Sequence, residues 1–184
     1  CGNLLAYGRP TDLVRIYEIN PLVVEAARKE FYFLRETPAK VEHVLGDGRL
    51  SLEYDPPQNF DILVMDAFSG DSVPVHLITR EAIQLYRKHL RRDGLLAVNI
   101  TNKYLDMRPV IAAAASDLGL AAYYHSFVPD PGDTLCNTVE WIIVSDPSAM
   151  PAPPPGVTSA DQLAPVSGFR TWTDDFSNLL RILR

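Results

Sequence analysis

The sequence predicts an α/β fold built on a doubly wound, mostly parallel sheet. Segments with strand character alternate along the chain with segments of helical spacing, which is the pattern of βαβ units. Residues 62–65 are all apolar, as expected for a parallel strand covered on both faces. Several predicted strands also end in acidic or amide side chains, at the edge where such sheets bind ligands.

The first third of the chain contains two predicted strands and one predicted helix. Residues 12–19 alternate in polarity and are rich in β formers, which predicts a strand. Residues 20–36 have apolar residues at helical spacing, so we expect one helix, with Asn20 as its N-cap and Pro21 at its first position. Residues 41–47 are predicted to be the second strand, and we expect only a short turn after it.

The middle of the chain continues the alternation. Residues 62–68 are predicted to be the third strand. Residues 79–94 are predicted to be a helix that starts at the cap Thr79 and stops at Gly94. Residues 95–100 are then predicted to be the fourth strand.

The remaining elements complete the sheet. Residues 106–118 form a predicted alanine-rich helix that ends near Gly119. Residues 120–127 and 140–146 are the last two predicted strands, and a loop rich in proline, aspartate and glycine joins them.

The distribution of proline divides the chain into three predicted parts. We expect residues 1–146 to form a single α/β domain. Residues 147–168 begin with a proline-rich stretch and are predicted to be an extended surface connector. Residues 169–184 carry apolar residues near helical spacing, which predicts a short last helix docked on the same domain.

The composition excludes several classes of function. The net charge of −6 argues against a nucleic-acid partner, which needs a basic face. The two cysteines form no CxxC pair and the four histidines are scattered, so we expect neither a metal site nor a disulfide framework. Reduced thiols, with no membrane-length apolar run and no signal peptide, favour a cytoplasmic protein.

Acidic and amide side chains end four successive predicted strands. In chain order they are Glu18, then Asp47, then Asp66 with Asp71, then Asn99, Thr101 and Asn102. Each one alone is more often a turn former or a helix cap than a ligand. Together on one edge, they favour a cationic or hydroxyl-rich ligand.

Two of these acids also fit a nucleoside. A carboxylate that ends the strand after a glycine-rich loop accepts hydrogen bonds from ribose hydroxyls, which suits Glu18. Asp47 is placed for the exocyclic amine of adenine, although a simple Gly-Asp-Gly turn explains it equally well. Only Gly2 represents the loop, so we expect the loop's other glycines and the first strand of the sheet to lie upstream of Cys1.

Four segments carry a resemblance to a known family. The order YEINP, VLGDGRLSLE, FDILVMDAFSGDSVPVHLITREA and DGLLAVNITN resembles the spermidine synthase-like proteins, which are relatives of the polyamine aminopropyltransferases. The resemblance covers roughly residues 1–146, and Thr173-Asp174-Asp175 is similar to a TDD segment near that family's C-terminus. It implies a Rossmann-like sheet of the class I methyltransferase type, with the first strand missing from this chain.

The resemblance also implies roles for particular residues. The implied residues for decarboxylated S-adenosylmethionine are Gly2, Glu18, Ile19, Asp47, Gly48 and Asp66. Asp66 would be the catalytic carboxylate nearest the reacting amine of a polyamine. Asp71 would hold the distal ammonium of a diamine such as putrescine. Asp174 would line the same substrate site from the tail, although capping of the final helix explains it equally well. The resemblance implies no metal.

The sequence departs from the family in ways that keep other functions open. The two acids of the central block are five residues apart, whereas authentic synthases have them closer in a DSSD-like run. The family's N-terminal β-hairpin domain is absent from the sequence. A methyltransferase that uses S-adenosylmethionine and a non-catalytic nucleoside-binding domain of the same fold are the alternatives. Related enzymes pair as homodimers, and similar sequences occur joined to membrane-spanning segments, so both arrangements stay open for a longer parent chain.

Overall fold

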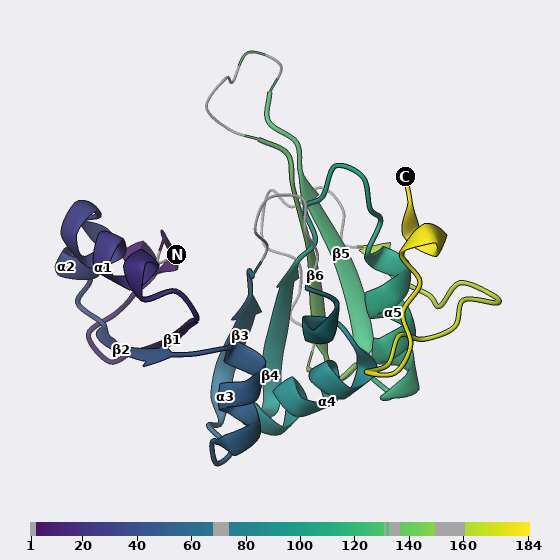
Figure 1. Cartoon of the computed structure of the whole chain (residues 1–184), viewed down its shortest axis with the longest axis horizontal. Helices are drawn as coiled ribbons and strands as arrows, with labels where there is room; N and C mark the ends of the chain where they lie inside the picture. The colour runs from purple at the N-terminus through teal and green to yellow at the C-terminus, as the bar shows by residue number, and fades with distance from the viewer. Residues whose placement is uncertain (1–2, 68–73, 131, 133–136, 150–160) are drawn as a thin grey trace. The chain divides into compact units, whose positions relative to one another are not determined.

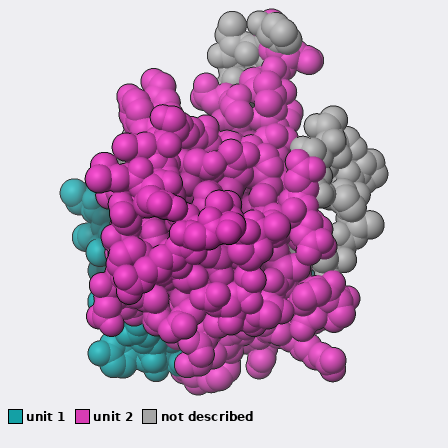
Figure 2. Space-filling model, turned by 90° about the vertical axis from the view of Figure 1, so that its right-hand side faces the viewer, with its two compact units in different colours: residues 1–55 teal, residues 56–184 magenta. Residues whose placement is uncertain are grey.

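The computed structural model confirms the α/β class (Figure 1). The residues that it describes are 3–67, 74–130, 132, 137–149 and 161–184. The chain forms two compact units, which Figure 2 colours separately: unit 1 is Cys1–Asp55 and unit 2 is Pro56–Arg184. Each unit has its own sheet and is described by itself.

Unit 1 is a small α/β unit. In chain order its elements are η1 (Asn3–Tyr7), β1 (Leu13–Glu18), α1 (Pro21–Glu30), α2 (Phe33–Glu36), β2 (Lys40–Leu45) and α3 (Gly48–Tyr54). β1 and β2 are parallel, as predicted, and Glu18 at the end of β1 lies opposite Leu45 at the end of β2.

The single helix predicted over residues 20–36 is wrong in its length. Its start is as predicted, because the Asn20 side chain accepts a hydrogen bond from the Leu22 amide at 3.0 Å. However, Phe31 adopts an extended backbone conformation and ends α1. The break lets Phe33 begin α2 as a buried side chain, stacked on Phe31 with ring centroids 5.2 Å apart. Aromatic packing has therefore overridden the helical periodicity.

The short turn predicted after β2 is instead the helix α3. The Asp47 side chain caps it by accepting a hydrogen bond from the Leu50 amide at 2.9 Å. Gly46, with φ of +148°, supplies the turn from strand to helix in a conformation that favours glycine. Burial of Leu52 then fixes one face of this helix.

Unit 2 carries the larger sheet. Its elements are β3 (Phe60–Met65), η2 (Val75–Leu77), α4 (Arg80–His89), β4 (Leu90–Asn99), α5 (Arg108–Asp117), β5 (Ala121–Phe127), β6 (Val139–Ser145), β7 (Asp161–Gln162) and η3 (Leu179–Ile182). The strand order is β3-β4-β6-β5-β7. Within the described residues, no helix is both long and apolar enough to span a membrane.

One reversed strand decides which side chains share an edge of this sheet. β3 and β4 are parallel, whereas β6 is antiparallel to both of its neighbours, β4 and β5. β3, β4 and β5 therefore run in the same direction, in agreement with the predicted mostly parallel arrangement. The carboxyl ends of β3 and β4 share their edge with the amino end of β6.

The helix predicted over residues 79–94 ends five residues early. It stops at His89, and Leu90 already pairs with Phe60 of β3. The register then shifts, so that the extra residues of β4 form a bulge. Gly94 is needed there, because a Cβ at this position would lie 2.8 Å from the Phe60 carbonyl oxygen. The Asp-Gly pair that predicts a helix stop is part of this bulge.

The core of unit 2 lies between α5 and the sheet. Residues 110–115 of α5 are all buried, and this helix packs on β5 and β6. Its run of alanines allows a close approach to the sheet, where Ile142 and Val144 of β6 are also buried. Gly119, with φ of +69°, ends the helical segment close to the predicted position.

The last described segment packs on the body of unit 2. Its β7 pairs with the outer edge of β5, within the stretch predicted to be a connector. Trp172 and Ile182 are buried, and the Asp106 amide donates to the Ile182 carbonyl at 2.7 Å. The expected final helix is the single 3-10 turn η3.

Candidate functional site

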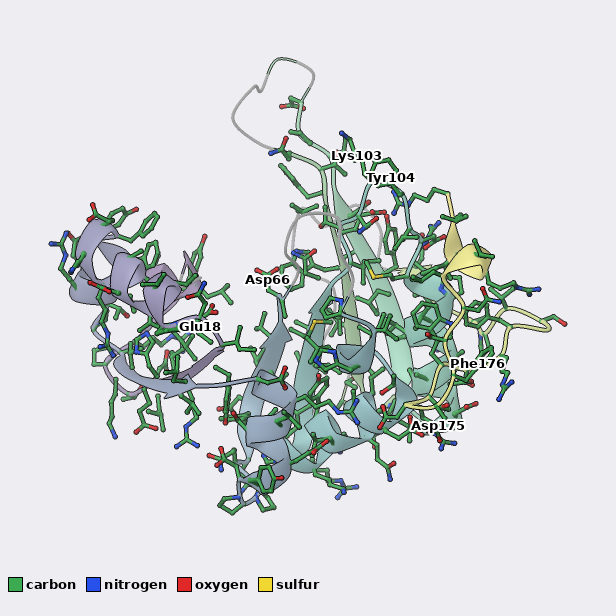
Figure 3. All side chains as sticks on the ribbon, viewed as in Figure 1. Glu18, Asp66, Lys103, Tyr104, Asp175 and Phe176 are labelled. Carbon is green, nitrogen blue, oxygen red and sulfur yellow. The ribbon has the colours of Figure 1, made fainter. Side chains whose placement is uncertain are left out.

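Asp66 stands at the end of β3, directly after its buried last residue Met65 (Figure 3). Its side chain is bonded to the end of the neighbouring strand, because Asn99 Nδ2 donates to Asp66 Oδ1 at 2.8 Å. The residue is exposed, and within the described part of the chain no hydrogen bond or ion pair uses its second oxygen, Oδ2. One carboxylate oxygen is thus held by Asn99, and the other has no bond within the described residues.

Asn99 and Thr101 form a tight turn at the end of β4. Asn99 Oδ1 accepts a hydrogen bond from the Thr101 amide at 2.9 Å. Because a backbone amide can only donate, this bond fixes which end of the Asn99 side chain is the oxygen. The amide nitrogen of Asn99 must therefore point to Asp66.

The reversed strand β6 holds Thr101 in place. The Glu140 amide donates to Thr101 Oγ1 at 2.9 Å, and the same hydroxyl lies 3.4 Å from the Glu140 carbonyl oxygen. The Ile100 amide donates to that carbonyl at 2.9 Å. The backbone amide and the carbonyl of Glu140 therefore both hold the end of β4, the amide at Thr101 and the carbonyl at the preceding residue.

Glu140 is buried and its side chain has two partners. The residue is 9% exposed, and its Oε1 accepts a hydrogen bond from the Tyr124 hydroxyl at 2.6 Å. Its Oε2 is paired with the Arg184 guanidinium. Burial and the hydrogen bond to Glu140 both raise the pKa of Tyr124, so this hydroxyl stays protonated as a donor.

Sequence reasoning missed Glu140. The available signal was a single acidic residue, Glu140, near the start of the strand VEWIIVS, whose other residues are mostly apolar. A carboxylate within such an apolar run needs partners when it is buried. Its place beside Asn99 and Thr101 follows only from the antiparallel pairing of β6 with β4.

Unit 1 presents the other predicted acids at the ends of its two strands. Glu18 ends β1, and its Oε1 accepts a hydrogen bond from the Asn20 amide at 2.9 Å. The Gly46 amide donates to the Glu18 carbonyl at 3.0 Å, which brings the end of β2 against the end of β1. Asp47 follows there as the cap of α3. The structure therefore places Glu18 and Asp47 at one edge of the unit 1 sheet.

The neighbours of these acids are also defined. Ile19 follows β1 as an exposed side chain. Gly48 is the first residue of α3, where an added Cβ would meet the Tyr17 Cβ at 3.5 Å. Gly2 and Asp71 lie outside the described residues.

Asp174 has a local structural role. Its Oδ1 accepts a hydrogen bond from the Thr79 hydroxyl at 2.7 Å, and its amide donates to Glu81 Oε2 at 3.1 Å. These contacts fasten the tail to the start of α4. In Figure 3 the adjacent Asp175 lies well apart from Asp66 within unit 2. The assignment of Asp174 to substrate binding stays a prediction.

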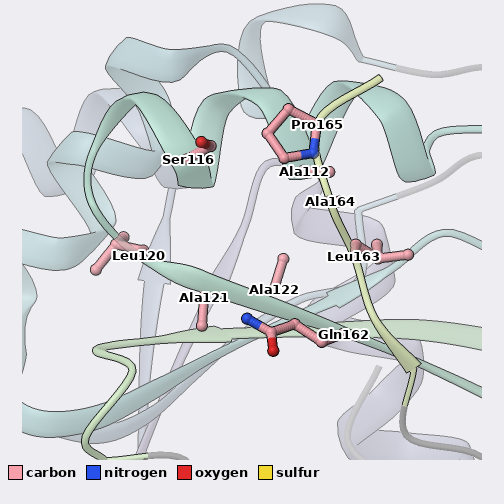
Figure 4. Close-up of a pocket in the computed structure, with 9 residues that line it drawn as sticks. All are labelled: Ala112, Ser116, Leu120, Ala121, Ala122, Gln162, Leu163, Ala164 and Pro165. Carbon is pink, nitrogen blue, oxygen red and sulfur yellow. The ribbon is translucent and has the colours of Figure 1, made fainter. Parts of the chain in front are cut away.

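A separate hollow of about 370 Å³ lies beside α5 and β5 (Figure 4). Its lining consists of Ala112, Ser116, Leu120, Ala121, Ala122, Gln162, Leu163, Ala164 and Pro165. Apart from Gln162, these side chains are small or apolar, and none is ionisable, so the hollow lacks the carboxylates that the strand ends carry. Among the described residues, no cluster of three or more histidine, cysteine, aspartate or glutamate side chains is arranged to hold a metal ion.

Comparison with known proteins finds relatives that match about half of the chain. No protein-family model matches the chain. It is 33% identical over 101 residues to a polyamine aminopropyltransferase from Vibrio vulnificus, a match that spans 53% of this chain and 33% of the relative. Over about half of its length the chain is therefore similar to a polyamine aminopropyltransferase. The family resemblance predicted from the sequence segments is confirmed.

A second curated relative is named for a different transfer. The chain is 31% identical over 98 residues to the N-terminal histidine N-methyltransferase of Emericella nidulans, which spans 53% of this chain and 17% of the relative. Both relatives are transferases by name. The chain spans a third or less of the length of these curated relatives.

Solved structures agree on the fold. A probable spermidine synthase from Corynebacterium glutamicum has a TM-score of 0.52 at 20% identity, covering 71% of this chain and 46% of its own. Human methyltransferase-like protein 13, solved in complex with SAH, has a TM-score of 0.55 at 15% identity, covering 85% of this chain and 68% of its own. The class I methyltransferase type of fold is thereby confirmed.

Proposed function

We propose that this protein is an aminopropyltransferase that uses decarboxylated S-adenosylmethionine and a polyamine acceptor such as putrescine. The observation that carries the proposal is Asp66, an exposed residue that follows β3 and has one carboxylate oxygen held by Asn99. Similarity to a polyamine aminopropyltransferase supports the same reaction. An exposed carboxylate at a strand end suits a cationic substrate.

The reaction is a displacement at carbon. The neutral amine nitrogen attacks the methylene carbon of the aminopropyl group that is bonded to the sulfonium sulfur, a C–N bond forms, and the bond from that carbon to sulfur breaks with its electron pair going to sulfur. Methylthioadenosine leaves as a neutral thioether, and Asp66 takes the proton from the new ammonium, directly or through water. Alignment of the two reactants supplies up to about 7–11 kcal/mol of the barrier reduction.

Two acids resolve a conflict in this chemistry. A nearby carboxylate stabilises an ammonium and raises the pKa of the amine, which opposes formation of the nucleophile. We propose that Asp71 holds the distal ammonium in its charged form while Asp66 accepts the proton from the reacting nitrogen. Unit 1 supplies the residues proposed for the nucleoside: Gly2, Glu18, Ile19, Asp47 and Gly48.

A methyl transfer is the second candidate, because the N-methyltransferase of Emericella nidulans matches a similar share of the chain. The two reactions differ in co-substrate and in product. Aminopropyl transfer consumes decarboxylated S-adenosylmethionine and releases methylthioadenosine. Methyl transfer consumes S-adenosylmethionine and releases S-adenosylhomocysteine. We further propose that the protein acts in the cytoplasm, without a metal ion, and as a homodimer.

One set of assays tests the function. The chain is incubated with each co-substrate and putrescine, and the products are identified by mass spectrometry. Formation of spermidine and methylthioadenosine supports aminopropyl transfer, and S-adenosylhomocysteine supports methyl transfer instead. Asp66→Asn is expected to abolish transfer while calorimetry shows nearly unchanged binding of methylthioadenosine. Unchanged turnover in this variant would overturn the role of Asp66.

A further inference from the structure

Asn99 is bonded on both sides by groups whose donor and acceptor roles are fixed. Its oxygen accepts from the Thr101 amide at 2.9 Å, and its nitrogen donates to Asp66 at 2.8 Å. We infer that Asn99 is a positioning residue that holds the Asp66 carboxylate in one orientation for the acceptor amine. This inference rests on the proposed role of Asp66 in group transfer.

The anchoring of Asn99 makes it suitable for that task. Thr101 cannot shift freely, because its hydroxyl and the preceding amide are bonded to the backbone of Glu140. Glu140 is in turn held by Tyr124 from β5 and by Arg184 from the tail. The orientation of one side chain at the end of β4 is thus set by three other segments of unit 2. Such support reduces the freedom of a catalytic group more than a single contact does.

The neutrality of the Asn99 amide matters for the chemistry. A lysine or arginine at this position would form an ion pair with Asp66 and compensate its charge. Among the described residues, no salt bridge involves Asp66. The amide therefore restrains Oδ1 without compensating the negative charge, and it leaves Oδ2 as the oxygen that accepts the proton from the reacting amine.

The alternative explanation is that the Asn99 side chain only stabilises the turn at the end of β4. An oxygen that accepts from the amide two residues later is typical of asparagine and aspartate in turns. Asparagine and aspartate serve that turn equally, so a turn role tolerates Asn99→Asp. A positioning role does not, because the new carboxylate lacks the donor and repels Asp66.

The kinetic test compares Asn99→Asp with Asn99→Ala, and with Gln84→Ala as the control, because Gln84 is an exposed amide on α4. We expect Asn99→Ala to lower kcat about 10- to 100-fold, from the loss of a hydrogen bond to a charged group. Asn99→Asp is expected to lower kcat further. The affinity for methylthioadenosine should stay near that of the control. Wild-type kcat in Asn99→Asp would overturn the inference.

A spectroscopic readout separates this inference from the proposed function. The Asn99 side-chain amide is assigned in a ¹H–¹⁵N spectrum by its loss in Asn99→Asp. We expect Asp66→Ala to shift that resonance and Gln84→Ala to leave it in place. A chain that transfers neither group defeats the proposed function, and the resonance then decides the positioning role alone. An Asn99 resonance that does not respond to Asp66→Ala would refute it.

Discussion

The ion pair between the buried Glu140 and the exposed Arg184 offers a quantitative test of how the tail is held. In Glu140→Gln the Tyr124 hydroxyl keeps an acceptor, whereas the new amide faces the Arg184 guanidinium with its own donors. The Glu140 side chain is 11% exposed but that of Arg184 is 36% exposed, so solvent screens part of the interaction. We therefore expect a loss of about 1–3 kcal/mol, the range for a hydrogen bond to a charged group.

The two tryptophans make the assay specific to unit 2. Trp141 follows Glu140 in β6, and Trp172 is buried in the tail, so urea unfolding followed by fluorescence reports on this unit. Arg184→Gln and the double variant complete a mutant cycle, which should give a coupling energy of about 1 kcal/mol or more.

An exposed pair serves as the matched control in the same unit. Arg91 and Asp61 form a surface ion pair, so Asp61→Asn should change the free energy of unfolding by less than about 1 kcal/mol. A coupling energy near zero between Glu140 and Arg184, or a loss in Glu140→Gln no larger than that of the control, would refute the reasoning.

Two further changes test a pH dependence and a helix cap. Burial raises the pKa of Asp106, but hydrogen bonds from Arg108 outweigh burial, and the pKa in the folded state is lowered. The ionised Asp106 therefore contributes its full stabilisation above the unfolded-state pKa. This contribution is lost as the pH falls through the lower folded-state pKa. Arg108→Gln should be less stable at neutral pH and lose less stability on acidification; equal slopes of unfolding free energy against pH would contradict this. Asp47→Ala should destabilise α3 by about 1 kcal/mol in urea unfolding followed by circular dichroism, and Asp47→Asn should keep the cap. If the carboxylate also serves adenine, calorimetry should show weaker methylthioadenosine binding in both variants, whereas full binding in Asp47→Asn would assign Asp47 to the cap alone.

The features that the sequence predicted correctly are short-range ones. The caps Asn20 and Thr79 bond to amides two or three residues away, so their signal lies within one turn. The apolar run before Asp66 likewise predicts a strand that ends in acid. The misjudged cases depend on competition between local and distant contacts. Phe31 leaves the helix where aromatic packing begins, and α4 ends at His89 where pairing with β3 begins.

For the candidate site, the sequence by itself determined which residues end the strands, and with them the family that the chain resembles. It could not determine that Asp66 is bonded to Asn99, because that contact joins residues 33 positions apart through the register of two strands. It also could not place Glu140 beside Thr101, since only the reversed direction of β6 brings the start of that strand to this edge. The preference of a segment for helix, strand or turn depends on residues that are neighbours in the sequence. The contacts of a side chain with distant segments depend on strand order and direction, which only tertiary packing decides.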